Sequence, residues 1–194
     1  MDFISARGEG LGEYLLVGYP DKTVGDKLLL ERRLFCETYQ QAVPKDILPH
    51  LLLAQFWARD IMEPTLIKWI QRICAGTAPF QVQLDRFGAE AGHICLRVQH
   101  PLPFQRLASD LLSVDQFIRA SGCPPAHLAE HPSIRITGDC SPELYRMAVM
   151  DYAARSFSEQ FLLEELQLLH RSNPFDKCRL LHVFRFKPAL TEVA

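Results

Sequence analysis

The sequence predicts an α+β protein made of two pseudo-symmetric lobes of antiparallel-rich sheet, with outer helices around a central cleft. Two observations favour this class. Short apolar or alternating runs, typical of strands, alternate along the chain with longer runs of helical period. The same order of elements also occurs twice, which favours two similar layered units that share one core. At 194 residues, the chain is long enough to form this as a single bilobal domain over residues 1–194.

The first half of the chain supplies the clearest elements. We expect, in order, a strand over 13–20, a helix over 21–40, a strand over 48–57, a helix over 63–76, strands over 80–87 and 93–99, and a helix over 104–121. The helix over 21–40 is predicted from one apolar stripe, Val24, Leu28, Leu34 and Phe35. The segment GAEAG, between the two alternating strands, is typical of a hairpin linker.

The second half repeats this plan after a proline-marked loop, CPPAHLAEHP. A short strand, SIRITG, precedes a helix that begins in SPELYRMAVM, and two strands follow, FLLEELQLLHR and CRLLHVFRF. The N-terminal strand and helix can supply the partners that the second half lacks. The repeat therefore predicts two lobes with a cleft between them, which is a usual place for a small-ligand site.

Composition and charge exclude several classes of protein. The net charge of −2 and the pI near 6.4 lack the basic footprint of a protein that coats duplex DNA. No apolar run approaches the roughly 18–20 residues that cross a bilayer, and the start of the chain lacks a signal-peptide core. The six cysteines stand singly, without the close pairs typical of zinc sites. We expect a soluble cytoplasmic protein with unpaired thiols and no membrane partner, in an oligomeric state that the sequence leaves open.

Two strands begin alike, about 80 residues apart. LPHLLLAQFW (48–57) places His50 directly after a proline, and EHPSIRITGD (130–139) places Ser133 after one. Alternate residues of a strand face the same side. His50 therefore shares a face with Leu52, and Ser133 shares one with Arg135.

These features resemble the two-histidine (2H) phosphoesterase superfamily, whose best-known branch is the bacterial 2′-5′ RNA ligases. The family pattern is two copies of His-x-Thr/Ser-x, about 80 residues apart, one on the central strand of each lobe. PHLLLA (49–54) and HPSIRIT (131–137) stand at the two places, and the matching order of elements covers nearly the whole chain. Other segments, such as DKLLLERRLF and EPTLIKWIQRIC, also look like one branch of the family.

The resemblance implies a metal-free and cofactor-free chemistry on a phosphodiester. One imidazole removes a proton from the attacking oxygen and the other protonates the leaving oxygen. Imidazole suits both roles because its pKa lies near neutrality. The hydroxyls of the two motifs hold the non-bridging phosphate oxygens.

The sequence departs from this pattern at both motifs. The first keeps His50 but has Leu52 in the hydroxyl position. The second has two possible registers. Aligning Pro49 with Pro132 puts Ser133 at the histidine position and Arg135 at the hydroxyl position, whereas the literal pattern uses His131 and Ser133. We prefer the proline register, because both motifs then leave their loops identically.

We therefore expect a protein that binds an RNA end, a cyclic nucleotide or a similar phosphodiester, with weak or lost catalysis. The absence of one acid/base group costs roughly 10²–10⁴ in rate, and an arginine binds phosphate but cannot shuttle protons near neutral pH. The candidate catalytic residues are His50 and His131, and the candidate substrate-binding residues are Ser133 and Arg135. Two alternatives stay open: an active cyclic phosphodiesterase or 2′-5′ RNA ligase that uses His50 and His131, and a non-catalytic interaction scaffold.

Overall fold

The described part of the chain, residues 10–42, 48–173 and 176–187 of a computed structural model, folds into nine strands and four α-helices. The helices are α1 (Lys22–Thr38), α2 (Glu63–Ala75), α3 (Leu102–Ala120) and α4 (Pro142–Ala153), with a 3-10 turn, η2 (Asp60–Met62), before α2. The strands are β1 (Leu11–Gly18), β2 (Leu51–Arg59), β3 (Phe80–Glu90), β4 (His93–Val98), β5 (His127–Leu128), β6 (Ser133–Arg135), β7 (Ser156–Leu163), β8 (Glu165–Arg171) and β9 (Arg179–Arg185).

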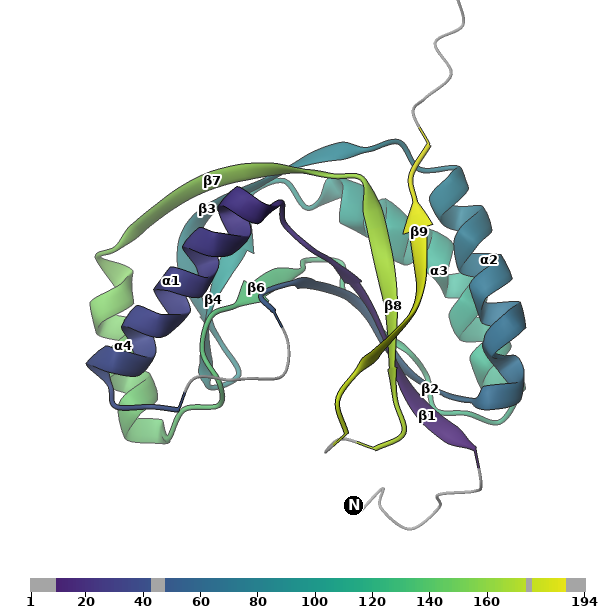
Figure 1. The fold of residues 1–194 in the computed structure, drawn as a ribbon, viewed down its shortest axis with the longest axis horizontal. Helices are drawn as coiled ribbons and strands as arrows, with labels where there is room; N and C mark the ends of the chain where they lie inside the picture. The colour runs from purple at the N-terminus through teal and green to yellow at the C-terminus, as the bar shows by residue number, and fades with distance from the viewer. Residues whose placement is uncertain (1–9, 43–47, 174–175, 188–194) are drawn as a thin grey trace, which may run out of the picture.

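All strand pairs are antiparallel and join into one sheet in the order β7-β3-β4-β6-β2-β1-β8-β9, with β5 paired to β2. We call β7, β3, β4 and β6 with α1 and α4 the first lobe, and the remaining strands with α2 and α3 the second lobe (Figure 1). The lobes meet where β2 pairs with β6, through Leu51 and Ile134. The predicted α+β class, with two lobes and outer helices, is confirmed.

The internal repeat runs differently from the one predicted. The order β1-α1-β2-α2 recurs as β4-α3-β6-α4, and each half of the chain contributes strands to both lobes. The run FLLEELQLLHR, predicted as one strand, belongs to two: β7 ends at Leu163 in the first lobe, and β8 begins at Glu165 in the second. The sequence does not show where the chain passes from the first lobe to the second, because this run has no turn residue and both strands have the same periodicity.

The main core fills the space between the helices and the sheet. Helix α1 contributes Val24 and Leu28 to it, and Phe35 packs in a second cluster with Ile94 and Tyr152; the three α1 residues are buried, as predicted. The predicted core position of Leu34 is wrong, since this side chain is 37% exposed and the buried stripe passes through Arg32. Residues three to four positions apart share one face of a helix. Position 32 lies four residues after Leu28 and three before Phe35, so Arg32 falls on the buried face.

The hairpin between β3 and β4 is tighter than the predicted five-residue linker. Strand β3 continues to Glu90, and only Ala91 and Gly92 form the turn, with φ of 42° and 85°. Two central residues at positive φ match the twist of a two-residue hairpin, and glycine takes the second without strain.

The sheet face opposite the helices is called here the open face. In the second lobe it carries a small apolar cluster, Leu15, Val17 and Leu169, against which Tyr19, Leu52 and Cys178 pack. In the first lobe, Ile134 and Leu96 point into the main core, so their strand neighbours lie on the open face: Ser133, Arg135, Cys95 and Arg97. Four of the six cysteines, Cys36, Cys74, Cys95 and Cys123, are buried. No described helix is long and apolar enough to cross a membrane.

Candidate functional site

The two motif strands pair with each other at the centre of the sheet. Leu51 of β2 is the register partner of Ile134 of β6, and both side chains are fully buried in the main core. Both Pro49 and Pro132, two positions before these residues, are also buried. Because the pair is antiparallel, the register places His50 across from Arg135 and Leu52 across from Ser133. A twofold rotation about the central pair instead relates His50 to Ser133 and Leu52 to Arg135, as the aligned prolines do.

His50 lies just before β2 and is fixed by its own loop. Its Nδ1 donates to the carbonyl oxygen of Leu48 at 2.8 Å. Since the carbonyl can only accept, the proton of the neutral ring sits on Nδ1, and Nε2 keeps the basic lone pair. The pKa of His50 is lowered from its ordinary value, chiefly by burial; the Leu48 hydrogen bond opposes this shift, and the nearby Arg32 cation adds to it. His50 is therefore a neutral imidazole with an available acceptor nitrogen.

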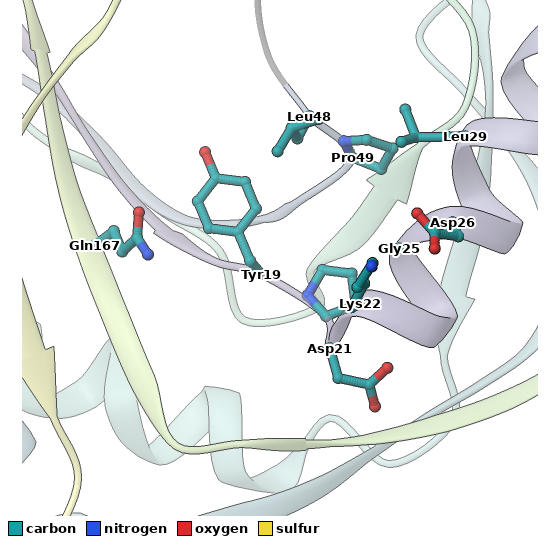
Figure 2. Close-up of a pocket in the computed structure, with 10 residues that line it drawn as sticks. Tyr19, Asp21, Lys22, Gly25, Asp26, Leu29, Leu48, Pro49 and Gln167 are labelled. Atoms are coloured by element: carbon teal, nitrogen blue, oxygen red, sulfur yellow. The ribbon is translucent and has the colours of Figure 1, made fainter.

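A pocket of about 380 Å³ lies beside His50, where the start of α1 faces strands of the second lobe (Figure 2). It is lined by Tyr19, Pro20, Asp21, Lys22, Gly25, Asp26, Leu29, Leu48, Pro49 and Gln167. Tyr19 lines the pocket and also lies next to His50, since the centroids of the two rings are 5.9 Å apart. Asp21 caps α1 by accepting from the Val24 amide at 2.9 Å. The lining combines the Tyr19 ring, prolines and leucines with the Gln167 amide and three charged side chains, two carboxylates and one ammonium. With more negative than positive charge, it suits an uncharged planar group better than an anion.

Ser133 faces the open side of β6 and is held by a carboxylate. Its hydroxyl donates to Glu90 Oε2 at 2.9 Å, and the Cys95 thiol lies 3.7 Å from the same oxygen. Burial, followed by the charge of Glu90, raises the pKa of Cys95 to about 11, so this thiol is protonated and unreactive near neutral pH.

Arg135 lies on the same face as Ser133, and its guanidinium has two neighbours. Nη2 donates to Asp139 Oδ1 at 2.6 Å and to His93 Nδ1 at 2.9 Å. The pKa of His93 is lowered, first by burial and then by Arg135. Asp139 is 84% exposed and the Arg135 side chain 49%. An ion pair this exposed contributes about 0–1 kcal/mol, so an anionic ligand can displace Asp139 at small cost.

His131 lies in the bend before β6 and is exposed. Its Nε2 lies 3.3 Å from the Gln105 amide nitrogen on α3. The structure thus brings His50, Ser133 and Arg135 to neighbouring positions on two adjoining strands, and gives His131 a neighbour on a helix.

Arg32 of α1 supports the second motif from behind. Its Nε donates to the Ile136 carbonyl at 3.2 Å, and its Nη2 donates to the Arg135 carbonyl at 3.1 Å. Burial lowers the pKa of this guanidinium. Since these carbonyls lie at the end of β6 and directly after it, Arg32 fixes the end of the motif strand.

Sequence reasoning missed three residues that shape this region: Tyr19, Glu90 and His93. Tyr19 is separated from His50 by a whole helix, and no motif links the two. The sequence pattern places Glu90 in a linker and His93 at the start of the strand that follows, and only the extended pairing of β3 with β4 turns them toward β6. In the described part of the chain, no group of three or more His, Cys, Asp or Glu side chains is arranged to hold a metal ion.

Comparisons with known proteins support the fold. A scan against protein-family models found no match, and neither did a search of curated proteins. Among solved structures, the chain is similar to E. coli LigT complexed with 3′-AMP, with a TM-score of 0.61, 17% identity, and coverage of 91% of this chain and 99% of LigT. It is also similar to TT0787 of Thermus thermophilus, with a TM-score of 0.65, 16% identity, and coverage of 91% of this chain and 99% of TT0787.

These likenesses extend over whole chains at low identity, so they are likenesses of fold. They confirm the fold that the resemblance to the 2H phosphoesterases predicted. LigT has also been solved with NADP+, with phosphate and with ATP.

Proposed function

We propose that the protein binds a small nucleotide, an RNA end or a similar phosphodiester on the open face beside His50, with catalysis weak or lost. The observation that carries this proposal is the position of His50. A neutral imidazole with a basic Nε2 stands at the centre of the sheet, next to a pocket that suits a nucleobase. The ligands named in the LigT structures are nucleotides and phosphate, which is the same chemical class.

The proposed orientation of the ligand follows from the charges. The phosphate lies toward β6, where Ser133 and Arg135 offer a hydroxyl and a guanidinium. The base lies toward Tyr19, Pro49 and Gln167. A ring stacked on Tyr19 gains about 1–3 kcal/mol, the range for base–aromatic stacking.

Weak catalysis follows from the residue that replaces the second histidine. At the corresponding position the chain has Ser133, which cannot act as a proton shuttle near neutral pH. Leu52 replaces the first hydroxyl and cannot donate to phosphate. One positioned acid/base supplies roughly 10²–10⁴ in rate, so its loss leaves binding with little turnover.

The test is a panel of 2′,3′-cyclic nucleotides and 2′-5′ linked dinucleotides, scored for binding and for hydrolysis. We expect binding that His50→Ala or Tyr19→Ala weakens, and turnover near background. Turnover that both His50→Ala and His131→Ala abolish would instead identify an active phosphodiesterase or RNA ligase that uses these two histidines. If the protein binds no member of the panel, the remaining alternative is a non-catalytic interaction scaffold.

A further inference from the structure

Three arginines stand on the open face of three neighbouring strands: Arg86 on β3, Arg97 on β4 and Arg135 on β6. Two of them are engaged. Arg86 lies 3.2 Å from Asp85, and Arg135 lies 2.6 Å from Asp139. Among the residues that the structure describes, no carboxylate oxygen lies within 4.0 Å of Arg97. Arg97 is therefore a cation whose charge is not neutralised by a direct ion pair within the described chain.

The Arg97 side chain lies across the bare backbone of Gly88. A Cβ atom at Gly88 would be 2.4 Å from Arg97 Nε and 3.1 Å from both Cγ and Cδ. Gly88 does not have a positive φ, so this strand position does not need glycine for its backbone conformation. What glycine provides is space. The bare glycine lets the Arg97 side chain lie close to the sheet. Without this space, the side chain would extend into water.

The position of Arg97 along the sheet is set by its pairing. Its register partner on β6 is Ser133, the residue that corresponds to His50. Directly opposed residues of an antiparallel pair have Cβ atoms about 4.5–5.5 Å apart, so the long arginine side chain reaches the space in front of Ser133.

We infer that Arg97, laid across Gly88, is the residue that holds the phosphate oxygens of the nucleotide. The inference rests on the proposed function and adds to it the cation that the sequence pattern did not reveal. A guanidinium binds phosphate through two parallel N–H bonds. Arg97 can form them without leaving a carboxylate, whereas Arg135 must first release Asp139.

Glu90 opposes this binding. Its carboxylate accepts from Ser133 and lies near Cys95, whose pKa responds to Glu90 and to Arg97 with opposite signs. A bound phosphate therefore faces a negative charge beside Ser133. The Glu90→Gln variant removes that charge and should raise the affinity for a nucleotide by about two- to fivefold, the size of a partly solvated charge interaction.

The test measures the affinity of the full chain for 3′-AMP by calorimetric titration. Arg97→Ala should lower this affinity by about 10- to 100-fold, the effect of losing hydrogen bonds to a charged group. Gly88→Ala keeps every charge but displaces the Arg97 side chain, and should give a loss in the same direction. Arg86→Ala is the matched control on the neighbouring strand and should change the affinity less than about threefold, because Arg86 is already paired with Asp85.

Different results would overturn the proposed nucleotide binding and the role of Arg97. Unmodified protein that does not bind 3′-AMP or any member of the nucleotide panel would overturn the proposed function, and with it the role of Arg97. Unmodified protein that binds, together with an Arg97→Ala variant of equal affinity and melting temperature, would overturn the role of Arg97 alone. A loss for Arg86→Ala as large as that for Arg97→Ala would also overturn it, because the effect would then be one of general charge.

Discussion

His50 is the residue from which the proposed chemistry starts, and its protonation state can be predicted. Burial and the Arg32 cation lower its pKa, so it should titrate below the ordinary histidine value of 6.5. The unfolded chain then binds more protons than the folded one between these two pKa values. Stability contributed by neutral His50 is thus fully present above pH 6.5 and is lost as the pH falls toward the folded pKa.

Proton NMR of the histidine rings across pH 4–8 would measure this pKa, with His50→Ala identifying the resonance (the pH range is roughly that over which histidine titrates). We expect a pKa below the ordinary value, which rises when a phosphate-bearing ligand binds nearby. A His50 resonance that titrates at or above the ordinary value would contradict the neutral imidazole described above.

A second histidine, His170, is buried in the second lobe. It is 3% exposed, its ring centroid lies 4.7 Å from that of Tyr14, and Arg179 Nε donates to its Nδ1 at 3.2 Å. The imidazole fits because position 12 is glycine. A Cβ there would lie 2.1 Å from His170 Nε2.

Gly12→Ala should therefore destabilise the protein by about 1–3 kcal/mol, the cost of overpacking a filled core. Thermal or urea denaturation measures the change. Gly138→Ala is the control, since a Cβ at that position meets no atom within 4 Å. Adding His170→Ala to Gly12→Ala should relieve the clash, and equal stability of Gly12→Ala and Gly138→Ala would refute the close packing.

At the scale of the element, the two motif strands should accept repair. Changing Leu52→Thr, Ser133→His and Arg135→Thr together rebuilds two complete His-x-Thr motifs on strands that already pair. Their core-facing residues, Leu51, Leu53, Ile134 and Ile136, are buried and unchanged, so the fold should survive. We expect detectable hydrolysis of a 2′,3′-cyclic nucleotide, up to the roughly 10²–10⁴ that one acid/base supplies.

The repaired variant carries its own control. Adding His50→Ala to it should abolish the new activity if both imidazoles act on the same phosphate. A repaired protein that folds and binds the nucleotide without hydrolysing it would mean that the two strands do not present positions 50 and 133 to one ligand.

Local pattern predicted most elements, and contacts between distant segments explain the failures. The helical stripe of α1 and the proline-led starts of both motif strands are readable from a few residues. The break at Glu164 is not, because β7 and β8 are told apart only by their partners, β3 and β1. The site divides in the same way. His50, Ser133 and Arg135 follow from strand alternation, whereas Tyr19, Glu90 and Arg97 reach the site through pairing and a ring contact that no short motif encodes.

At the scale of the whole molecule, the open face is asymmetric. The second lobe presents the apolar cluster around Leu15 and Leu169, and the first lobe presents charged and hydroxyl side chains. His50 stands at the boundary, with the Tyr19 pocket beside it. A nucleotide has the same division between a flat apolar base and an anionic phosphate, so the boundary between the lobes is where both of its ends find complementary surroundings.

The most direct test of this account is a titration of the unmodified protein with 3′-AMP, followed by backbone amide NMR. Nucleotide binding on the open face should give saturable shifts at about millimolar or lower ligand concentrations, a range typical of a binding free energy near −4 kcal/mol or better. The largest shifts should group at Tyr19, His50, Gly88 and Ser133, on both sides of the lobe boundary. Shifts confined to the helix-covered face, or none at these concentrations, would contradict the claim that the open face beside His50 is a nucleotide site.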